Sequence, residues 1–102
     1  MKKSNFDEYQ KQANLASDMQ DNHGRGRIVI AALGLGEESG EFAKLVKDSV
    51  ISGKKIDLQY AGEWLGDILW YVAEACSALD ISFQDVAETN IQKLKKRKLN
   101  ER

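Results

Sequence analysis

The sequence contains no proline, one cysteine and one histidine among its 102 residues. The absence of proline favours long helices, because proline disrupts a helix interior. The one cysteine, Cys76, excludes an intramolecular disulfide and is typical of a reducing compartment. The one histidine, His23, excludes a histidine-rich zinc site, and its polar, glycine-containing surroundings predict an ordinary loop residue. No Ser-His-Asp or Cys-His catalytic set is indicated.

The chain also lacks a long apolar run and a large net charge. No apolar stretch reaches the ~18 residues of a membrane span, and no signal-type apolar segment follows the first residues. With 15 basic and 16 acidic residues, the formal net charge is -1, so no strong field attracts a nucleic acid polymer. We therefore expect a cytoplasmic protein that binds neither a membrane nor a nucleic acid polymer.

Apolar residues recur with helical spacing, which predicts an all-α protein, a four-helix bundle in a single domain over residues 1–102. Capping residues mark where the helices begin and end. The predicted set is a first helix after Asn5 with Glu8 completing a capping box, a second over 27–52 ending at Gly53, a third over 58–79 after Asp57, and a fourth after Ser82.

The third predicted helix is apolar around most of its circumference, a pattern typical of a helix buried on most sides. One short chain offers too little surface to cover it, so we expect a second subunit to pack against it. Three acidic residues, Glu63, Asp67 and Glu74, interrupt the pattern in one narrow stripe. This stripe is either the solvent-exposed face of the helix or part of a site.

Carboxylates also cluster on the second predicted helix, where Glu38 occupies a position that the helical repeat assigns to a hydrophobic residue. Glu37 and Glu41 lie on neighbouring turns. Like charges beside a core face carry a large penalty, which a bound cation removes. If the second and third helices form a hairpin, Asp67 and Glu63 lie opposite these glutamates. Oxygen ligands without histidine or thiolate suit Mg²⁺ or Mn²⁺.

Other features have two interpretations each. Three glycines inside the second helix, Gly34, Gly36 and Gly40, indicate either tight helix packing or close approach of a ligand. Asn90, beside the apolar face of the fourth helix, either fixes the packing register or points into a site. Lys93 and Arg97 are either solvated cations near a helix C-terminus or phosphate ligands.

Three segments carry a specific pattern in their order and spacing. They are Glu37-Glu38-x-x-Glu41, the run LGDILWY over 65–71, and Asn90-Ile91-x-Lys93-Leu94-x-x-Arg97. This combination resembles the MazG-like all-α nucleotide pyrophosphohydrolases, and the opening Phe6-x-x-Tyr9-Gln10 is similar to the start of small members of that family. The resemblance covers almost the whole chain, whereas the acidic element alone is a weak signal.

The resemblance implies a helical bundle that dimerises through its central helices or forms a dimer of dimers. It also implies Mg²⁺-dependent hydrolysis of a nucleoside triphosphate between the α and β phosphates. By position, it implies roles for three groups of residues: Glu38, Glu41 and Asp67 as metal ligands, with Glu37 assisting the attacking water; Asn90, Lys93 and Arg97 at the phosphates; and Trp70 on the base.

One position departs from the family pattern. The family places a glutamate three residues before the aspartate of the third helix, and this chain has Trp64 there, with Glu63 one residue earlier. The two positions point about 100° apart around the helix. Either Glu63 reaches the metal through a water or another rotamer, or the site has lost a ligand. A catalytically degraded nucleotide- or metal-binding bundle is therefore the alternative to an enzyme, and a plain structural bundle is a third case.

Overall fold

The computed structural model describes residues 5–19 and 24–101, which form four α-helices and no strand. The helices are α1 (Phe6–Leu15), α2 (Arg25–Ser52), α3 (Leu58–Ala78) and α4 (Phe83–Asn100). The all-α prediction is confirmed, and the observed helix ends lie within two residues of the predicted ones. His23, predicted to lie in a loop, is outside the described residues. No helix in the described part is long and apolar enough to cross a membrane.

The helix boundaries follow from the capping residues in the sequence. Three N-cap side chains each accept a hydrogen bond from a backbone N–H three residues later: Asn5 from Glu8 at 2.8 Å, Asp57 from Tyr60 at 3.1 Å, and Ser82 from Asp85 at 3.0 Å. The long helix α2 ends at Gly53, whose φ of 74° is the left-handed conformation that glycine adopts without strain. The short connection after Gly53 folds α2 and α3 into a hairpin.

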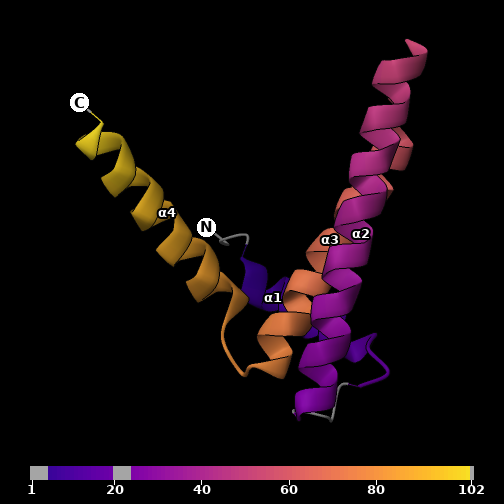
Figure 1. Ribbon diagram of the computed structural model, residues 1–102. Helices are drawn as coiled ribbons and strands as arrows, with labels where there is room; N and C mark the ends of the chain where they lie inside the picture. Colours follow the sequence, from indigo (N-terminus) through magenta and orange to yellow (C-terminus); the bar gives the residue numbers. More distant parts are fainter. Residues whose placement is uncertain (1–4, 20–23, 102) are drawn as a thin grey trace.

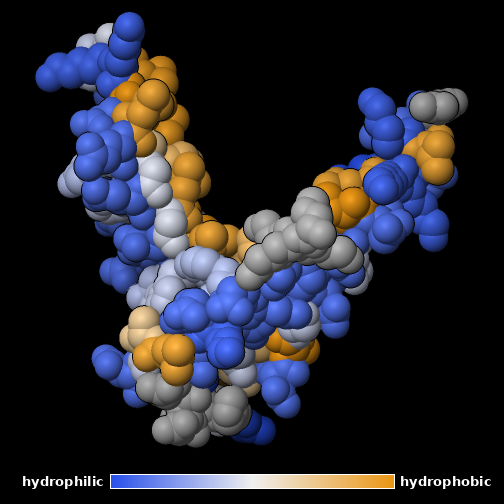
Figure 2. Space-filling view, turned by 180° about the vertical axis from the view of Figure 1, so that it is seen from behind, coloured by the Kyte–Doolittle hydropathy of each residue, from blue (hydrophilic) through white to orange (hydrophobic). Residues whose placement is uncertain are grey.

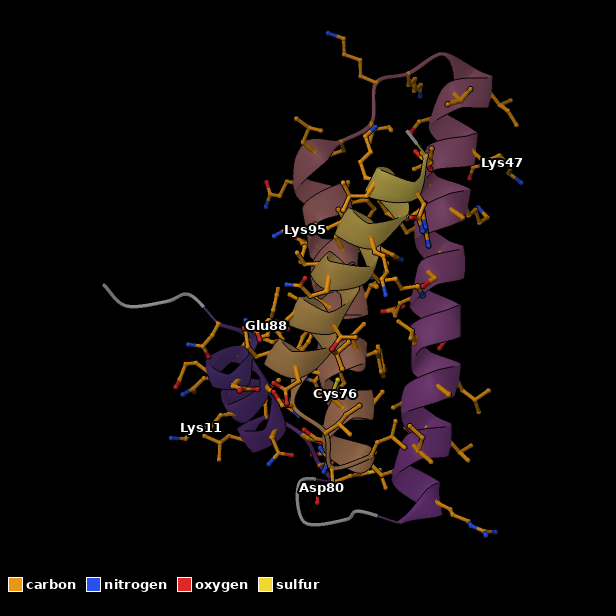
Figure 3. All side chains as sticks on the ribbon, turned by 90° about the vertical axis from the view of Figure 1, so that its left-hand side faces the viewer. Lys11, Lys47, Cys76, Asp80, Glu88 and Lys95 are labelled. Atoms are coloured by element: carbon orange, nitrogen blue, oxygen red, sulfur yellow. The ribbon has the colours of Figure 1, made fainter. Side chains whose placement is uncertain are left out.

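The α2–α3 hairpin is the main structural unit, and α1 packs against α3 near its C-terminal end (Figure 1). A small core forms where α1, α3 and the start of α4 meet, made of Ala13, Ala73, Cys76 and Phe83. The Phe6 ring stacks on the Phe83 ring with centroids 4.4 Å apart. Asp80 lies in the turn between α3 and α4, and Cys76 lies one turn earlier on α3 (Figure 3).

A buried ion pair fixes the two hairpin helices relative to each other. Arg27 of α2 donates from Nη2 to Oε1 of Glu74 on α3 over 2.6 Å, and the two side chains are 1% and 8% exposed. The Ser17 hydroxyl donates to the other Glu74 oxygen over 2.7 Å, and Asn14 accepts from Arg27 over 2.7 Å. The last turn of α1 and the segment just after it are thereby joined to the ion pair, and the ion pair sets the register of the hairpin.

Close packing in the hairpin explains one of the three α2 glycines. A Cβ on Gly34 would lie 2.2 Å from Cε1 of Tyr71, so only glycine leaves room for that ring. Gly36 and Gly40 have nothing within 4 Å of a Cβ in the described part of the chain. Tight packing is therefore the correct interpretation for Gly34, and Gly36 and Gly40 face open space.

The fourth helix diverges from the hairpin, so that the molecule has the shape of a V with α1 at its base (Figure 1). Hydrophobic residues line the inner edges of both arms (Figure 2). Large hydrophobic side chains that are 40% exposed or more occur on every arm, including Leu33, Leu58, Leu65, Ile91 and Leu94. One chain thus leaves the bundle open and much of its amphipathic surface uncovered.

Candidate functional site

Glu38 and Asp67 lie next to each other across the α2–α3 hairpin. Glu38 continues the α2 face that carries the buried residues Ala31 and Gly34, so its side chain is directed toward α3. Partial burial raises the pKa of Glu38, and the negative charge of the nearby Asp67 carboxylate raises it further. The structure therefore brings together two carboxylates that the sequence placed on separate helices.

The other predicted acidic residues lie around this pair at greater distance. Glu37 and Glu41 also raise the pKa of Glu38 through their negative charge, so both lie within electrostatic range of it. The Glu63 side chain is exposed to solvent. Within residues 5–19 and 24–101, no three histidine, cysteine, aspartate or glutamate side chains converge closely enough to enclose a metal ion. The site in this chain is a carboxylate pair with further acids nearby.

Aromatic side chains lie near the acidic cluster. The charge of Asp67 adds to burial in raising the pKa of the Tyr9 phenol, so Tyr9 of α1 lies within electrostatic range of Asp67. Trp64 lies one turn before Asp67 on α3, and its ring packs edge to face with that of Tyr60, with centroids 5.2 Å apart. A pocket between α2 and α3 is lined by these two rings and by Glu41.

Glu74, which the sequence grouped with Glu63 and Asp67 in one acidic stripe, is neither solvent-exposed nor part of the carboxylate site. It is buried and paired with Arg27, a partner that the sequence interpretation missed. A signal was present in the sequence: Arg27 occupies the same helical face as Ala31, Gly34 and Glu38, and a cation on a core-facing stripe requires a buried anion. Glu74 is therefore a structural residue of the hairpin.

The residues predicted to contact the substrate lie elsewhere. Asn90, Lys93 and Arg97 are exposed on α4, which contacts α1 and α3 but not α2 in the described part of the chain. A single chain therefore does not bring them to the carboxylates of α2. Trp70 packs against the small core and lies edge to face with Tyr71, their centroids 5.0 Å apart.

The chemistry of the donor set fits a hydrated Mg²⁺ ion. Mg²⁺ is typically bound through one or two carboxylates, keeps several waters and takes its other ligands from substrate phosphates. Glu38 and Asp67 supply such a pair, and the Asp67 charge adds to the effect of partial burial in raising the pKa of Glu38. Glu41 lies one turn from Glu38 and adds negative charge on the same side.

The helices and the carboxylate pair together define an all-α protein with an acidic site between its two central helices. A family model described as the MazG nucleotide pyrophosphohydrolase domain matches residues 30–100. The chain therefore belongs to the MazG nucleotide pyrophosphohydrolase family, as its resemblance predicted. The matched range contains every predicted metal and substrate residue.

The chain is also similar to the gene 37 protein of Mycobacterium phage L5. The two are 39% identical over an alignment of 72 residues, and the match covers 65% of this chain and 61% of the phage protein. The match thus spans about three fifths of that relative's length. No solved structure matches the chain significantly.

Proposed function

We propose that the protein is a Mg²⁺-dependent nucleotide pyrophosphohydrolase. The reaction cleaves a nucleoside or deoxynucleoside triphosphate between the α and β phosphates and yields a monophosphate and pyrophosphate. The observation that supports this most strongly is the Glu38–Asp67 pair on the central helices of a MazG-family chain. Two adjacent carboxylates disfavour each other's charge until a cation lies between them, and a cation there also neutralises substrate phosphates.

Each acidic residue has a distinct role in this proposal. Glu38 and Asp67 hold the Mg²⁺ ion, with Glu41 as a further ligand and Glu63 acting through a water. The ion, when bound, supplies charge neutralisation at the phosphates and lowers the pKa of a bound water. Glu37 accepts the proton of the water that attacks the α-phosphorus. The bond from that phosphorus to the bridging oxygen then breaks, and pyrophosphate leaves.

The working unit in this proposal is a homodimer or a dimer of dimers. The uncovered hydrophobic faces of the hairpin and of α4 support an oligomer, because isolated soluble chains rarely expose so much contiguous apolar surface. Opposite charges support a site shared between two copies. Helix α4 is basic from Lys93 onward, and the groove between α2 and α3 is acidic. In this arrangement, Asn90, Lys93 and Arg97 of one copy bind the phosphates held at the carboxylates of another.

The test is pyrophosphate release from a panel of canonical and modified triphosphates, with Mg²⁺, with Mn²⁺ and with a chelator. We expect metal-dependent release of pyrophosphate, and no orthophosphate, from at least one triphosphate. Glu38→Gln should lower the activity by at least ~10–100-fold, the loss that is typical when an outer-shell partner of a metal ligand is removed. Glu88→Gln is the matched control, because Glu88 is an exposed glutamate of α4 whose carboxylate accepts a hydrogen bond from Gln84. Orthophosphate release, or full activity of Glu38→Gln, contradicts the proposal.

A second function is favoured by one observation, the absence of a three-acid group in the described part of the chain. Together with Trp64 in the place of the family glutamate, it supports a degraded site that binds nucleotide or metal without turnover. The Trp64→Glu variant separates the two functions. If the wild type is inactive and the variant gains metal affinity and hydrolysis, the wild-type site is degraded. If the wild type is active and the variant loses activity, the protein is an enzyme whose site is complete without a glutamate at position 64.

A further inference from the structure

A pocket of about 190 Å³ lies beside the carboxylate pair, between α2 and α3. Its lining consists of Glu41, Lys44, Leu45, Asp48, Tyr60 and Trp64. Glu41 belongs both to this pocket and to the acidic cluster around Glu38, so the two sites are continuous. A ligand that occupies both sites has an anionic end at the metal and a flat or apolar end in the pocket.

Trp64 is the residue that distinguishes this pocket. It stands where the family pattern has a glutamate, and it forms an aromatic wall with Tyr60 at an interplanar angle of 61°. Its indole N–H is buried and has no hydrogen-bond partner in the described part of the chain. An unsatisfied buried donor is unfavourable, so an acceptor on a ligand toward which the indole turns would offset that penalty.

Lys44 and Asp48, both in the pocket lining, form an ion pair with each other. The Lys44 Nζ lies 2.9 Å from Oδ2 of Asp48, and both side chains are more than half exposed. An ammonium has three donors and a carboxylate has two acceptor oxygens, so the pair keeps the capacity to bind a heterocycle edge that presents an acceptor next to a donor. Aromatic side chains provide the stacking surface that every nucleobase uses.

We propose that this pocket binds the base of the substrate nucleotide and that Trp64 determines base specificity. The inference depends on the proposed function, since it places the triphosphate at Glu38 and Asp67. The volume lies below the ~300–1,000 Å³ typical of drug-sized ligands, so the pocket accommodates a base and not a whole nucleotide, and the smaller, single-ring bases enter it with the least crowding. The substrate class is therefore a pyrimidine nucleoside triphosphate, with its carbonyl oxygen at Lys44 and its N–H or amino group at Asp48.

The experiment compares kcat and KM for the four deoxynucleoside triphosphates in wild type, Trp64→Phe and Trp64→Leu. The control is Gln59→Ala, an exposed position on the same helix. Inorganic triphosphate, which lacks a base, serves as a competitive inhibitor. We expect wild type to prefer pyrimidines and Trp64→Leu to raise their KM about tenfold, the scale of base–aromatic stacking. Trp64→Phe should retain most of the affinity, and the inhibition constant of triphosphate should not change.

The outcomes separate the pocket from the reaction. If wild type is active but prefers purines, or if Trp64→Leu leaves the KM for every base unchanged, the base pocket is wrong and the proposed function stands. If Trp64→Leu weakens the binding of inorganic triphosphate as much as that of the nucleotides, the base pocket is also wrong, because Trp64 then acts on the phosphates. If wild type releases no pyrophosphate from any triphosphate, the proposed function fails first. Thermal melts of each variant show that it is folded, and Trp64→Phe provides the test if Trp64→Leu does not fold.

Discussion

Glu38 on α2 and Asp67 on α3 lie close together across the hairpin, although both are acids and no cation of the chain lies between them in the described structure. Such a pair is unfavourable for folding, because each carboxylate disfavours the charge of the other. Proteins retain arrangements of this kind mainly at functional sites, where local cost serves binding or chemistry. The buried Arg27–Glu74 pair, two turns along α3 from Asp67, holds the hairpin in the register that creates it.

Mixed oligomers test whether α4 acts in trans. Glu38→Gln and Arg97→Ala are each expected to be inactive as homo-oligomers, but a mixed dimer contains one site with wild-type groups from both copies. Random 1:1 mixing by co-refolding should therefore restore about a quarter of wild-type pyrophosphate release, as expected for two sites related by a two-fold axis. If the mixture stays as inactive as its parents, α4 serves its own chain, and the trans arrangement is wrong.

Loss of one partner of the buried ion pair should destabilise the fold strongly. Arg27→Met leaves the Glu74 carboxylate buried without its cation, and Glu74→Leu leaves the guanidinium without its anion. Each should lower the free energy of unfolding by about 3–5 kcal/mol, measured by urea denaturation. The double variant should recover part of this loss, because it leaves no uncompensated buried charge. Additive losses in the double variant would show that the pairing itself contributes little.

Substitution of the hairpin glycines should have opposite effects. Gly34→Ala forces the Tyr71 ring to move, so we expect it to destabilise the protein by roughly 1–3 kcal/mol. Gly40→Ala meets no atom within 4 Å among the described residues and should stabilise the isolated chain by up to about 1 kcal/mol through helix propensity. Thermal melts at low protein concentration give the comparison. Equal effects of the two substitutions would contradict the packing described for Gly34.

The Cys76 thiol should introduce a pH dependence at alkaline pH. Burial, with a smaller contribution from the Asp7 charge, raises the pKa of Cys76 above its ordinary value of 9.0. The folded state therefore keeps this proton to higher pH than the unfolded state, and the free energy of unfolding decreases as pH rises above about 9. Urea titrations at pH 8 and pH 10 should show a smaller decrease for Cys76→Ala than for wild type. Rapid alkylation of the native thiol at pH 8 would show that it is not buried.

Local signals in the sequence were sufficient to predict the helices. Asn5, Asp57 and Ser82 are N-caps with clear patterns, and Gly53 is a C-terminal signal, so the predicted helix ends are close to the observed ones. The proximity of Glu38 and Asp67 also followed from the hairpin, because a short connection leaves little choice of partner. These features depend on a few neighbouring residues and on helical periodicity.

Features that depend on the three-dimensional arrangement were not predictable in the same way. Glu74 shared the helix stripe of Asp67 and Glu63, and only the position of Arg27 on the facing helix shows that it is structural. Phe83 at the start of α4 packs against Phe6, a contact between distant parts of the chain that no local signal indicates. The pocket at Trp64 likewise requires the spacing of two helices. The sequence identified Trp64 as a departure from the family without indicating what it lines.

The proposed function depends on Glu38 and Asp67 together binding a divalent cation. The most direct measurement is a Mn²⁺ titration monitored by electron paramagnetic resonance, with wild type, Asp67→Asn and the control Glu88→Gln, in the absence of nucleotide. We expect saturable binding to wild type and to Glu88→Gln. The affinity of Asp67→Asn for Mn²⁺ should fall by at least ~10–100-fold, the loss typical for removal of an outer-shell partner. Equal Mn²⁺ affinity in Asp67→Asn and wild type would show that the cation, and with it the proposed chemistry, lies elsewhere.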